Sequence, residues 1–151
     1  MQPAGSGVDP EAVKCYLYFI GKPRDPHAKA IAEEFLKRSS RYLKCEMREI
    51  DPARFDPWQR NAQAVKVLCD PAGKAWASDQ FIDLIRRHEA EGRDLVFVLG
   101  GHDGLPADWK PRADLLLSLS PMTFPHELAR AMLAEQIYRA VTTLRGHPYP
   151  R

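Results

Sequence analysis

The most constraining feature of this 151-residue sequence is a short run with no polar side chain. Leu95–Leu99 reads LVFVL, and glycines follow it directly at positions 100, 101 and 104. A strand that is apolar at every position must be covered on both faces, which is typical of the centre of a parallel sheet. Glycines just after such a strand let the backbone turn sharply and approach a ligand closely. The run therefore predicts a layered α/β domain.

The rest of the chain alternates between strand-like and helix-like segments. Further strands are expected at 14–21, 44–50, 64–70 and 114–119, and helices at 27–43, 78–91 and from Pro125 to a stop at Gly146. Ser78 is expected to cap its helix and Gly92 to end it, whereas 51–60 and 71–73 are expected to be loops. Strands separated by helices predict a parallel sheet with helices on both faces.

Composition and length indicate in which compartment the protein is expected and how many domains it has. Hydrophobic residues make up 44% of the chain and charged residues 28%, with a net charge of +2, which is typical of a soluble globular protein. Cys15, Cys45 and Cys69 form no C-x-x-C pair, so we expect reduced thiols in a cytoplasmic protein. No run reaches the roughly 18 apolar residues of a membrane span, and positions 1–10 lack a secretory pattern. We expect a flexible leader at 1–12 and one domain at 13–151.

Ligands of parallel sheets bind beyond the carboxyl ends of the strands, where two segments are candidates. Gly100, Gly101 and Gly104 give the spacing G-G-x-x-G, which is neither the dinucleotide fingerprint nor a Walker sequence, so a plain tight turn is the alternative. The second segment, 117–126, reads LSLSPMTFPH. A strand end, a loop and a helix start there offer free main-chain groups and an apolar wall to an adenosine-like ligand. No G-x-S-x-G sequence surrounds its serines, which disfavours a hydrolase.

Positive charge is concentrated near the C-terminus. Residues 128–151 hold four arginines and one acid, Glu135. Arginines can contact phosphates, and Tyr149 and His147 offer rings for stacking, although a solvated helix face would look similar. His126, at the start of this helix, is open to a structural hydrogen bond as well as to a functional role. No Cys/His cluster or H-E-x-x-H sequence indicates a metal.

Taken in order, these segments resemble one family. LVFVLGGHDG (95–104), LSLSPMTFPHELAR (117–130), LAEQIYRA (133–140) and HPYPR (147–151) together resemble the RlmH family of SPOUT-class methyltransferases. The match is dense from Leu95 onward and thinner around Leu68–Lys74 and in the first strand. The combination is specific, whereas each part alone is weak.

The resemblance implies a fold and an activity. It implies a SPOUT-type parallel sheet with a C-terminal trefoil knot, which ordinary topology rules would not propose. It implies transfer of a methyl group from S-adenosylmethionine to the N3 atom of a pseudouridine in 23S ribosomal RNA of the large subunit. It also implies a homodimer with ribosomal RNA as its partner, and neither a metal nor a membrane.

The resemblance also implies which residues form the site. The donor would be held by Leu68, Cys69, Gly100, Gly101, Gly104, Leu119, Ser120, Pro121, Met122, Thr123 and Phe124. The tail of one subunit would complete the site of the other. RNA binding and catalysis would then fall to His126, Arg130, Arg139, His147, Tyr149 and Arg151.

The sequence departs from the family pattern in two places. Residues 51–63 are about one helix shorter than usual, and Pro150 stands where a histidine is usual. The shortened segment motivates an alternative, a non-catalytic RNA- or ribosome-binding protein that keeps the fold. A generic nucleotide-binding α/β protein would fit the composition but leaves the C-terminal pattern unexplained.

Overall fold

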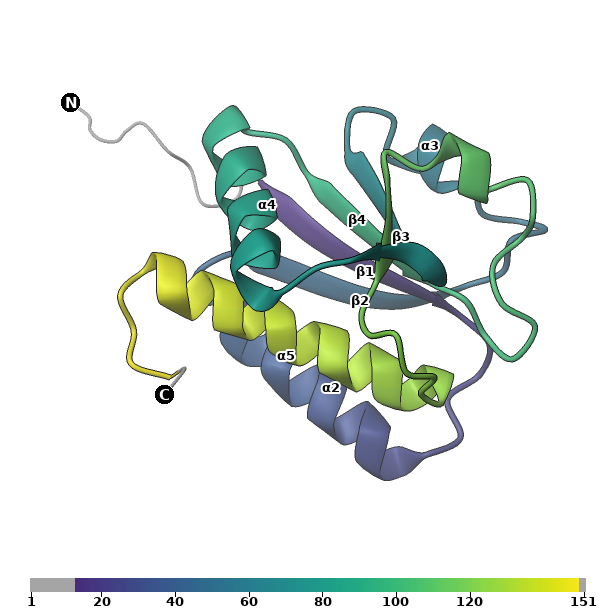
Figure 1. The fold of residues 1–151 in the computed structure, drawn as a ribbon, viewed down its shortest axis with the longest axis horizontal. Coiled ribbons are helices and arrows are strands. Elements are labelled where there is room, and N and C mark those ends of the chain that lie inside the picture. The colour runs from purple at the N-terminus through teal and green to yellow at the C-terminus, as the bar shows by residue number, and fades with distance from the viewer. Residues whose placement is uncertain (1–12, 150–151) are drawn as a thin grey trace.

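The computed structural model describes residues 13–149, which form a five-stranded, fully parallel sheet. The strands are β1 (Lys14–Ile20), β2 (Lys44–Ile50), β3 (Val65–Ala75), β4 (Leu95–Leu99) and β5 (Leu115–Ser118), in the spatial order β2-β1-β4-β3-β5 (Figure 1). The predicted parallel α/β sheet is confirmed, and β4 lies at its centre. The expected leader and Arg151 lie outside the described residues.

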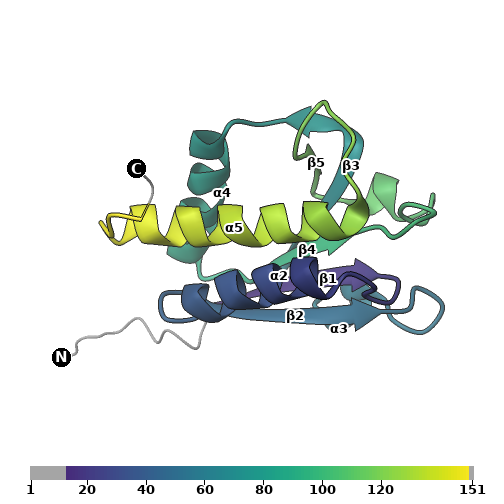
Figure 2. The same ribbon diagram turned by 90° about the horizontal axis from the view of Figure 1, so that it is seen from below.

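The two faces of the sheet are covered very differently. The helices α2 (Pro26–Ser39), α4 (Ser78–Glu91) and α5 (His126–Leu144) pack on one face, where α2 and α5 run side by side (Figures 1 and 2). The other face carries the short helix α3 (Pro57–Arg60) and the 3₁₀ turn η1 (Lys110–Arg112), with Trp58 and Trp109 packed edge to face. Helices thus lie on both faces, but the long ones share one side.

Strand alternation produces these two cores. Leu95, Phe97 and Leu99 of β4 face the long helices, and Val96 and Val98 face the tryptophans. All five side chains are buried, as the apolar run predicts. Burial on both faces fixes the strand's register, since a slip by one residue would exchange the two sets.

The third strand extends further than expected. It continues through 71–73 to Ala75, and its pairing with β5 shifts between Cys69 and Lys74. Gly73 suggested a turn in the sequence, but a Cβ atom there would lie 2.5 Å from the carbonyl oxygen of Leu116. The glycine therefore serves the close approach of two strands, and the loop prediction at 71–73 was wrong.

Two helix starts also differ from the prediction. Residues 57–60 form α3 within the expected loop, because the Asp56 side chain accepts a hydrogen bond from the Trp58 backbone N–H. Ser78 is not a cap, because Ala77 precedes α4 and its N–H donates to the Gln80 side chain. The predicted end at Gly92 is confirmed, with a left-handed φ of 70°.

The burial of residues along α5 does not simply follow their polarity. Leu133, Ile137 and Val141 are fully buried as expected, but Leu128 is 44% exposed and Met132 39% exposed. Arg130 is only 2% exposed, which a solvated helix face would not predict. Because α5 packs against both α2 and α4, its buried arc is wide enough to include this arginine. The trefoil knot stays a prediction from the resemblance.

Candidate active site

A cavity of about 310 Å³ opens at the carboxyl edge of the sheet. It lies where β4 and β5 end and α5 begins, beside the register shift of β3, at the edge where parallel sheets bind ligands. The lining residues are Cys69, Asp70, Pro71, Leu99, Gly100, Gly101, His102, Gly104, Leu105, Ser118, Leu119, Ser120, Met122, Thr123, Phe124, His126 and Ala129. The fold therefore unites the two candidate loops of the sequence in one site.

The first two positions of the glycine loop have no room for side chains. A Cβ on Gly101 would lie 2.6 Å from the carbonyl oxygen of Ile20, and one on Gly100 would lie 2.5 Å from the carbonyl carbon of Gly104. Gly104 adopts a φ of 78°, in the left-handed region that favours glycine. The loop is folded tightly on itself and on the end of β1, so its main chain forms one wall of the cavity.

The opposite wall is the loop that joins β5 to α5. The Ser118 hydroxyl donates to the carbonyl oxygen of Ser120, and the Ser120 hydroxyl accepts from the N–H of Met122. These two bonds fix the turn locally, and Leu119 packs against the core. Met122 is 72% exposed, an unusual position for a large apolar side chain.

Most of the predicted donor residues line this cavity. Two do not: Leu68 is buried on the other face of β3, and Pro121 is exposed beside the lining. Cys69 lines the wall, and burial raises the pKa of its thiol to about 12. The thiol is therefore neutral at physiological pH and is a poor nucleophile. The roles of these residues stay predictions.

Asp70 brings a negative charge to the cavity, and the sequence reading overlooked it. Burial alone would raise its pKa, but hydrogen bonds from Lys110 and from the Ala72 N–H outweigh burial and lower it. The Lys110 ammonium lies 2.8 Å from the carboxylate. The pair joins β3 to η1, so the carboxylate is ionised and held in place.

Two of the predicted catalytic residues lie at the start of α5 in different surroundings. His126 lines the cavity. Arg130 lies inside the protein, with its guanidinium 3.6 Å from the centre of the Phe19 ring, and burial lowers its pKa. Its Nε is buried without a hydrogen-bond partner among the described residues. Arg130 is therefore not exposed to RNA in this structure.

Glu127 fixes the same helix end to the loop after β1. Its carboxylate accepts hydrogen bonds from the N–H groups of Arg24 and Asp25, and these bonds lower its pKa. An acid in the first turn of a helix also interacts favourably with the helix dipole. Spacing alone gave no sign of this contact, which joins segments about a hundred positions apart.

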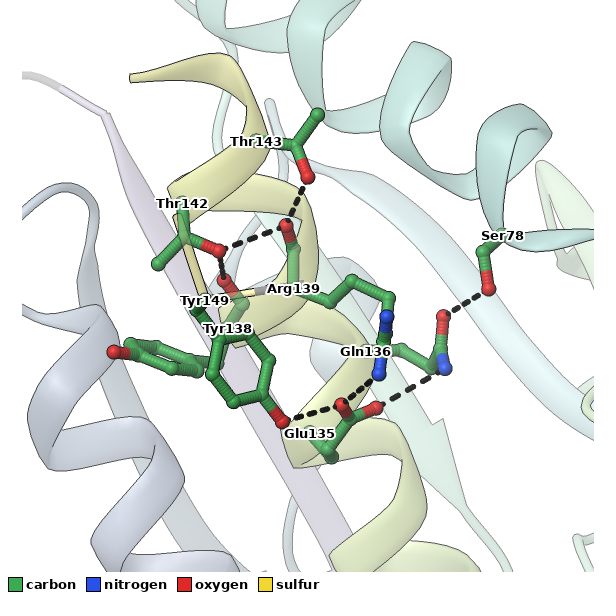
Figure 3. Close-up of polar contacts among 8 residues, drawn as sticks. All are labelled: Ser78, Glu135, Gln136, Tyr138, Arg139, Thr142, Thr143 and Tyr149. Carbon is green, nitrogen blue, oxygen red and sulfur yellow. Dashed lines mark hydrogen bonds and ion pairs between the residues drawn. The ribbon is translucent and has the colours of Figure 1, made fainter. Parts of the chain in front are cut away.

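The remaining described residues of the catalytic set lie at the other end of α5 (Figure 3). The hydroxyl of Tyr149 and the guanidinium of Arg139 both donate to the same carboxylate oxygen of Glu135, each at 2.7 Å. Gln136 donates to the other oxygen and accepts from Ser78 of α4. His147 accepts from the Tyr149 N–H through Nδ1. The tail is thus folded back on its own helix, and Arg151 lies outside the described residues.

Within one chain, the predicted catalytic residues therefore lie in two sets that are far apart. Arg139 follows His126 by thirteen positions along α5, a rise of about 20 Å at 1.5 Å per residue. The tail folds against Tyr138 and Phe35, away from the cavity lining. Within one protomer, Tyr149 and Arg139 do not reach the cavity.

Comparison with known proteins identifies the family. The family model described as "Predicted SPOUT methyltransferase" matches residues 13–150, nearly the whole chain. This chain belongs to the SPOUT methyltransferase family. A relative from Solibacter usitatus (strain Ellin6076), named Ribosomal RNA large subunit methyltransferase H, is 66% identical over 139 residues, covering 92% of this chain and all of that protein. The resemblance to the RlmH family is therefore confirmed.

Solved structures described as methyltransferases share the fold at low sequence identity. A probable methyltransferase from Bordetella pertussis Tohama I superposes with a TM-score of 0.59 at 13% identity, covering 88% of this chain and 99% of that one. A structure described as an AdoMet-bound rRNA methyltransferase from Sinorhizobium meliloti gives a TM-score of 0.54 at 13% identity, covering 83% of this chain and 56% of that one. At these identities the likeness concerns the fold alone.

The short segment at 51–63 is not peculiar to this SPOUT chain. The 139 positions aligned with the Solibacter relative account for all of that protein and 92% of this chain, which leaves no room for an inserted helix. Among residues 13–149, no helix is long and apolar enough to cross a membrane. In the same residues, no three His, Cys, Asp or Glu side chains come together as a metal site.

Proposed function

We propose that this chain transfers a methyl group from S-adenosylmethionine to the N3 atom of a pseudouridine in 23S ribosomal RNA. The observation that carries the proposal is the cavity at the carboxyl edge of the sheet, in a chain 66% identical to a protein named as a large-subunit rRNA methyltransferase. Such an enzyme acts where ribosomes are, so we place it in the cytoplasm.

The cavity suits an adenosine-containing donor. Its volume of about 310 Å³ is at the lower end of the range for ligand pockets. Leu99, Leu105 and Phe124 offer apolar surface to a base, and the two loops offer main-chain donors and acceptors. Bound there, S-adenosylmethionine would supply an electrophilic methyl group. The fold neighbour from Sinorhizobium meliloti is described as AdoMet-bound, which supports this choice.

The residues of the chain would bind and orient the acceptor. The imide nitrogen of the base must lose its proton before or as it attacks, and His126 at the cavity wall, His147 or water would accept that proton. The cationic guanidinium of Arg139 would favour the anionic form of the base. The neutral Cys69 thiol would not compete for the methyl group. Holding both reactants in contact supplies much of the rate.

A homodimer would bring these groups together. Leu128 and Met132 leave an apolar stripe exposed on α5, and Met122, which lines the cavity, is exposed as well. Pairing two such helices in an antiparallel manner would bury the stripe and place the tail of one chain at the cavity of the other. A two-fold axis makes both shared sites equivalent. This arrangement accounts for a separation of about 20 Å within one chain.

Two measurements test the proposal. Isothermal titration calorimetry with S-adenosylmethionine should show one site per subunit, and absence of binding would exclude the enzyme. Mass spectrometry of rRNA, after incubation with ribosomes that lack the modification, should show one added methyl group on a pseudouridine. Donor binding without transfer would favour the non-catalytic alternative, whose motivation is weak because a full-length relative shares the short segment.

A further inference from the structure

A second groove lies far from the donor cavity. It has a volume of about 450 Å³ and runs between the C-terminal half of α2 and the start of the tail. Its lining residues are Glu34, Lys37, Arg38, Arg41, Tyr42, Tyr138 and His147. We call this the α2–tail groove.

The charge of the α2–tail groove is positive. Lys37, Arg38 and Arg41 line it and are exposed, and they face one acid among the lining residues, Glu34. The Glu34 carboxylate lies 2.7 Å from Nε of Arg38, which offsets one charge. Two cations remain in excess, on a chain whose total net charge is only +2. Such a surface favours a polyanion.

Two rings form the end of the groove beside the tail. Tyr42 and His147 lie with their ring centres 6.2 Å apart and inclined at 59°. Nδ1 of His147 accepts the Tyr149 N–H, so the proton of the neutral imidazole is on Nε2. Arg145 donates to the carbonyl oxygen of Tyr42 at 3.0 Å and pairs with Glu89, which holds this end in place.

We propose that the α2–tail groove binds a single-stranded segment of the substrate RNA. Lys37 and Arg41 would contact successive phosphates, while His147 presents its ring and its Nε2–H to a base or ribose. Cations that lie beside aromatic rings suit the backbone and the bases of single-stranded nucleic acid. The inference rests on the proposed function, because it names the surface that delivers RNA to the shared site.

The groove is continuous with the residues that the proposed function needs. The Tyr149 backbone is bonded to His147 in the groove, and its hydroxyl is bonded to Glu135 beside Arg139. An RNA strand held on Lys37 and Arg41 would therefore lead to the tail that completes the partner's cavity. Contacts to Lys37 and Arg41 would affect substrate affinity and leave donor binding alone, since neither residue lines the donor cavity.

The test compares two double variants of equal charge. Lys37→Ala/Arg41→Ala removes two groove cations, and Lys29→Ala/Arg87→Ala removes two exposed cations from α2 and α4 outside the groove. The probe is a fluorescein-labelled single-stranded 20-nucleotide RNA, measured by fluorescence anisotropy from 50 to 300 mM KCl. For the groove variant we expect about ten-fold weaker binding and a salt slope shallower by about 1.4. The control should stay within about two-fold of wild type.

A third variant tests the contribution of the His147 ring apart from that of Lys37 and Arg41. His147→Ala should weaken RNA binding about five-fold and leave the salt slope unchanged, because stacking involves no counterion release. Methyl transfer by the Lys37→Ala/Arg41→Ala variant should show a raised KM for ribosomes with a similar kcat.

Each of the following outcomes would contradict RNA binding in the α2–tail groove. Equal losses of RNA affinity in both double variants would mean that RNA responds only to the overall charge of the protein. An unchanged affinity in the groove variant would mean that RNA does not contact Lys37 or Arg41. A change of oligomeric state in sedimentation would make the groove an interface between copies. If the wild type binds RNA but not S-adenosylmethionine, the proposed function fails while the anisotropy result still decides the groove.

Discussion

The two ends of α5 are built in opposite ways. At its start, the cavity is formed by main chain: glycines packed against carbonyl groups and a loop held by its own serines. At its end, Arg139, Tyr149 and Glu135 form a network of charged and polar side chains. Main-chain walls suit a small, invariant ligand, whereas long cationic side chains suit a large polyanion.

This contrast explains where the family's pattern can vary. A wall made of backbone depends little on which side chains its residues carry. The tail has no such tolerance, because its contacts come from particular side chains. Donor binding at the start of α5 should therefore be sensitive to added side-chain volume. The function of the tail at the end of α5 should be sensitive to the loss of particular side-chain groups.

The largest effect should come from removing the tail. Deleting residues 147–151 takes away His147 and Tyr149, so methyl transfer should fall at least about 100-fold while donor affinity changes less than about two-fold. Calorimetry and mass spectrometry of rRNA measure the two quantities. Retained transfer in this truncation would contradict a role for the tail.

Mixing two defective proteins sharpens the same comparison. The truncated chain has an intact cavity, and a cavity variant has an intact tail. If the tail acts on the partner, co-refolding the two should restore about a quarter of wild-type activity, because half of the dimers are mixed and each has one complete site. No recovery would mean that the tail acts within its own chain.

Adding volume to the glycine loop should be the next largest effect. In Gly101→Ala the new methyl group would meet the carbonyl oxygen of Ile20 at 2.6 Å, so the loop must move. A shift of about 1 Å should weaken donor binding about 100-fold in calorimetry. Gly92→Ala is the control: its φ of 70° is strained, but no atom lies within 4 Å, so stability should fall while donor affinity holds. Equal donor affinity in both variants would refute the tight-loop explanation.

The fold could be predicted where a segment's own pattern decides its structure. The bounds of β2 and β4 match their patterns, and α4 ends at Gly92 as expected. The errors lie where a distant segment decides. Gly73 marks a contact with Leu116 instead of a turn, and Arg130 is buried because Phe19 offers its ring.

The two loops of the candidate site could be predicted from the sequence. The separation of the cavity from the folded-back tail within one chain could not. Strand–glycine and strand–loop–helix patterns indicated the cavity, because both must reach the carboxyl edge of the sheet. The predicted helix already implied about 20 Å between His126 and Arg139, but the sequence did not show that the tail folds back on its own helix and away from the cavity. Asp70 with Lys110 and Glu127 with Arg24 are contacts between segments remote in sequence, which no local pattern encodes.

A smaller effect is expected from a single atom of the tail network. Tyr149→Phe removes the hydroxyl that donates to Glu135 at 2.7 Å but keeps the ring against Tyr138. The free energy of unfolding should fall by about 1 kcal/mol, the usual worth of one such hydrogen bond, as measured by urea titration. The matched variant Tyr42→Phe should change it less, because no hydrogen bond of that hydroxyl is found among the described contacts. Transfer should fall more than stability in Tyr149→Phe if the hydroxyl also serves the shared site.

The smallest effect should come from the ion pair at the cavity. Lys110→Gln leaves the Asp70 carboxylate without its ammonium partner and should lower the free energy of unfolding by about 0.5 kcal/mol at pH 7, since Lys110 is partly exposed. The pKa of Asp70 is lowered in the folded protein, so the pair's contribution is complete above the ordinary value of 3.8 and declines as the pH falls through the folded-state pKa. Urea titrations of wild type and variant should therefore converge in acid, and Lys22→Gln, an exposed control, should show no such convergence. A difference that persists once the carboxylate is protonated would mean that Lys110 acts through packing, and the cavity end of α5 would then depend on side chains more than its main-chain walls suggest.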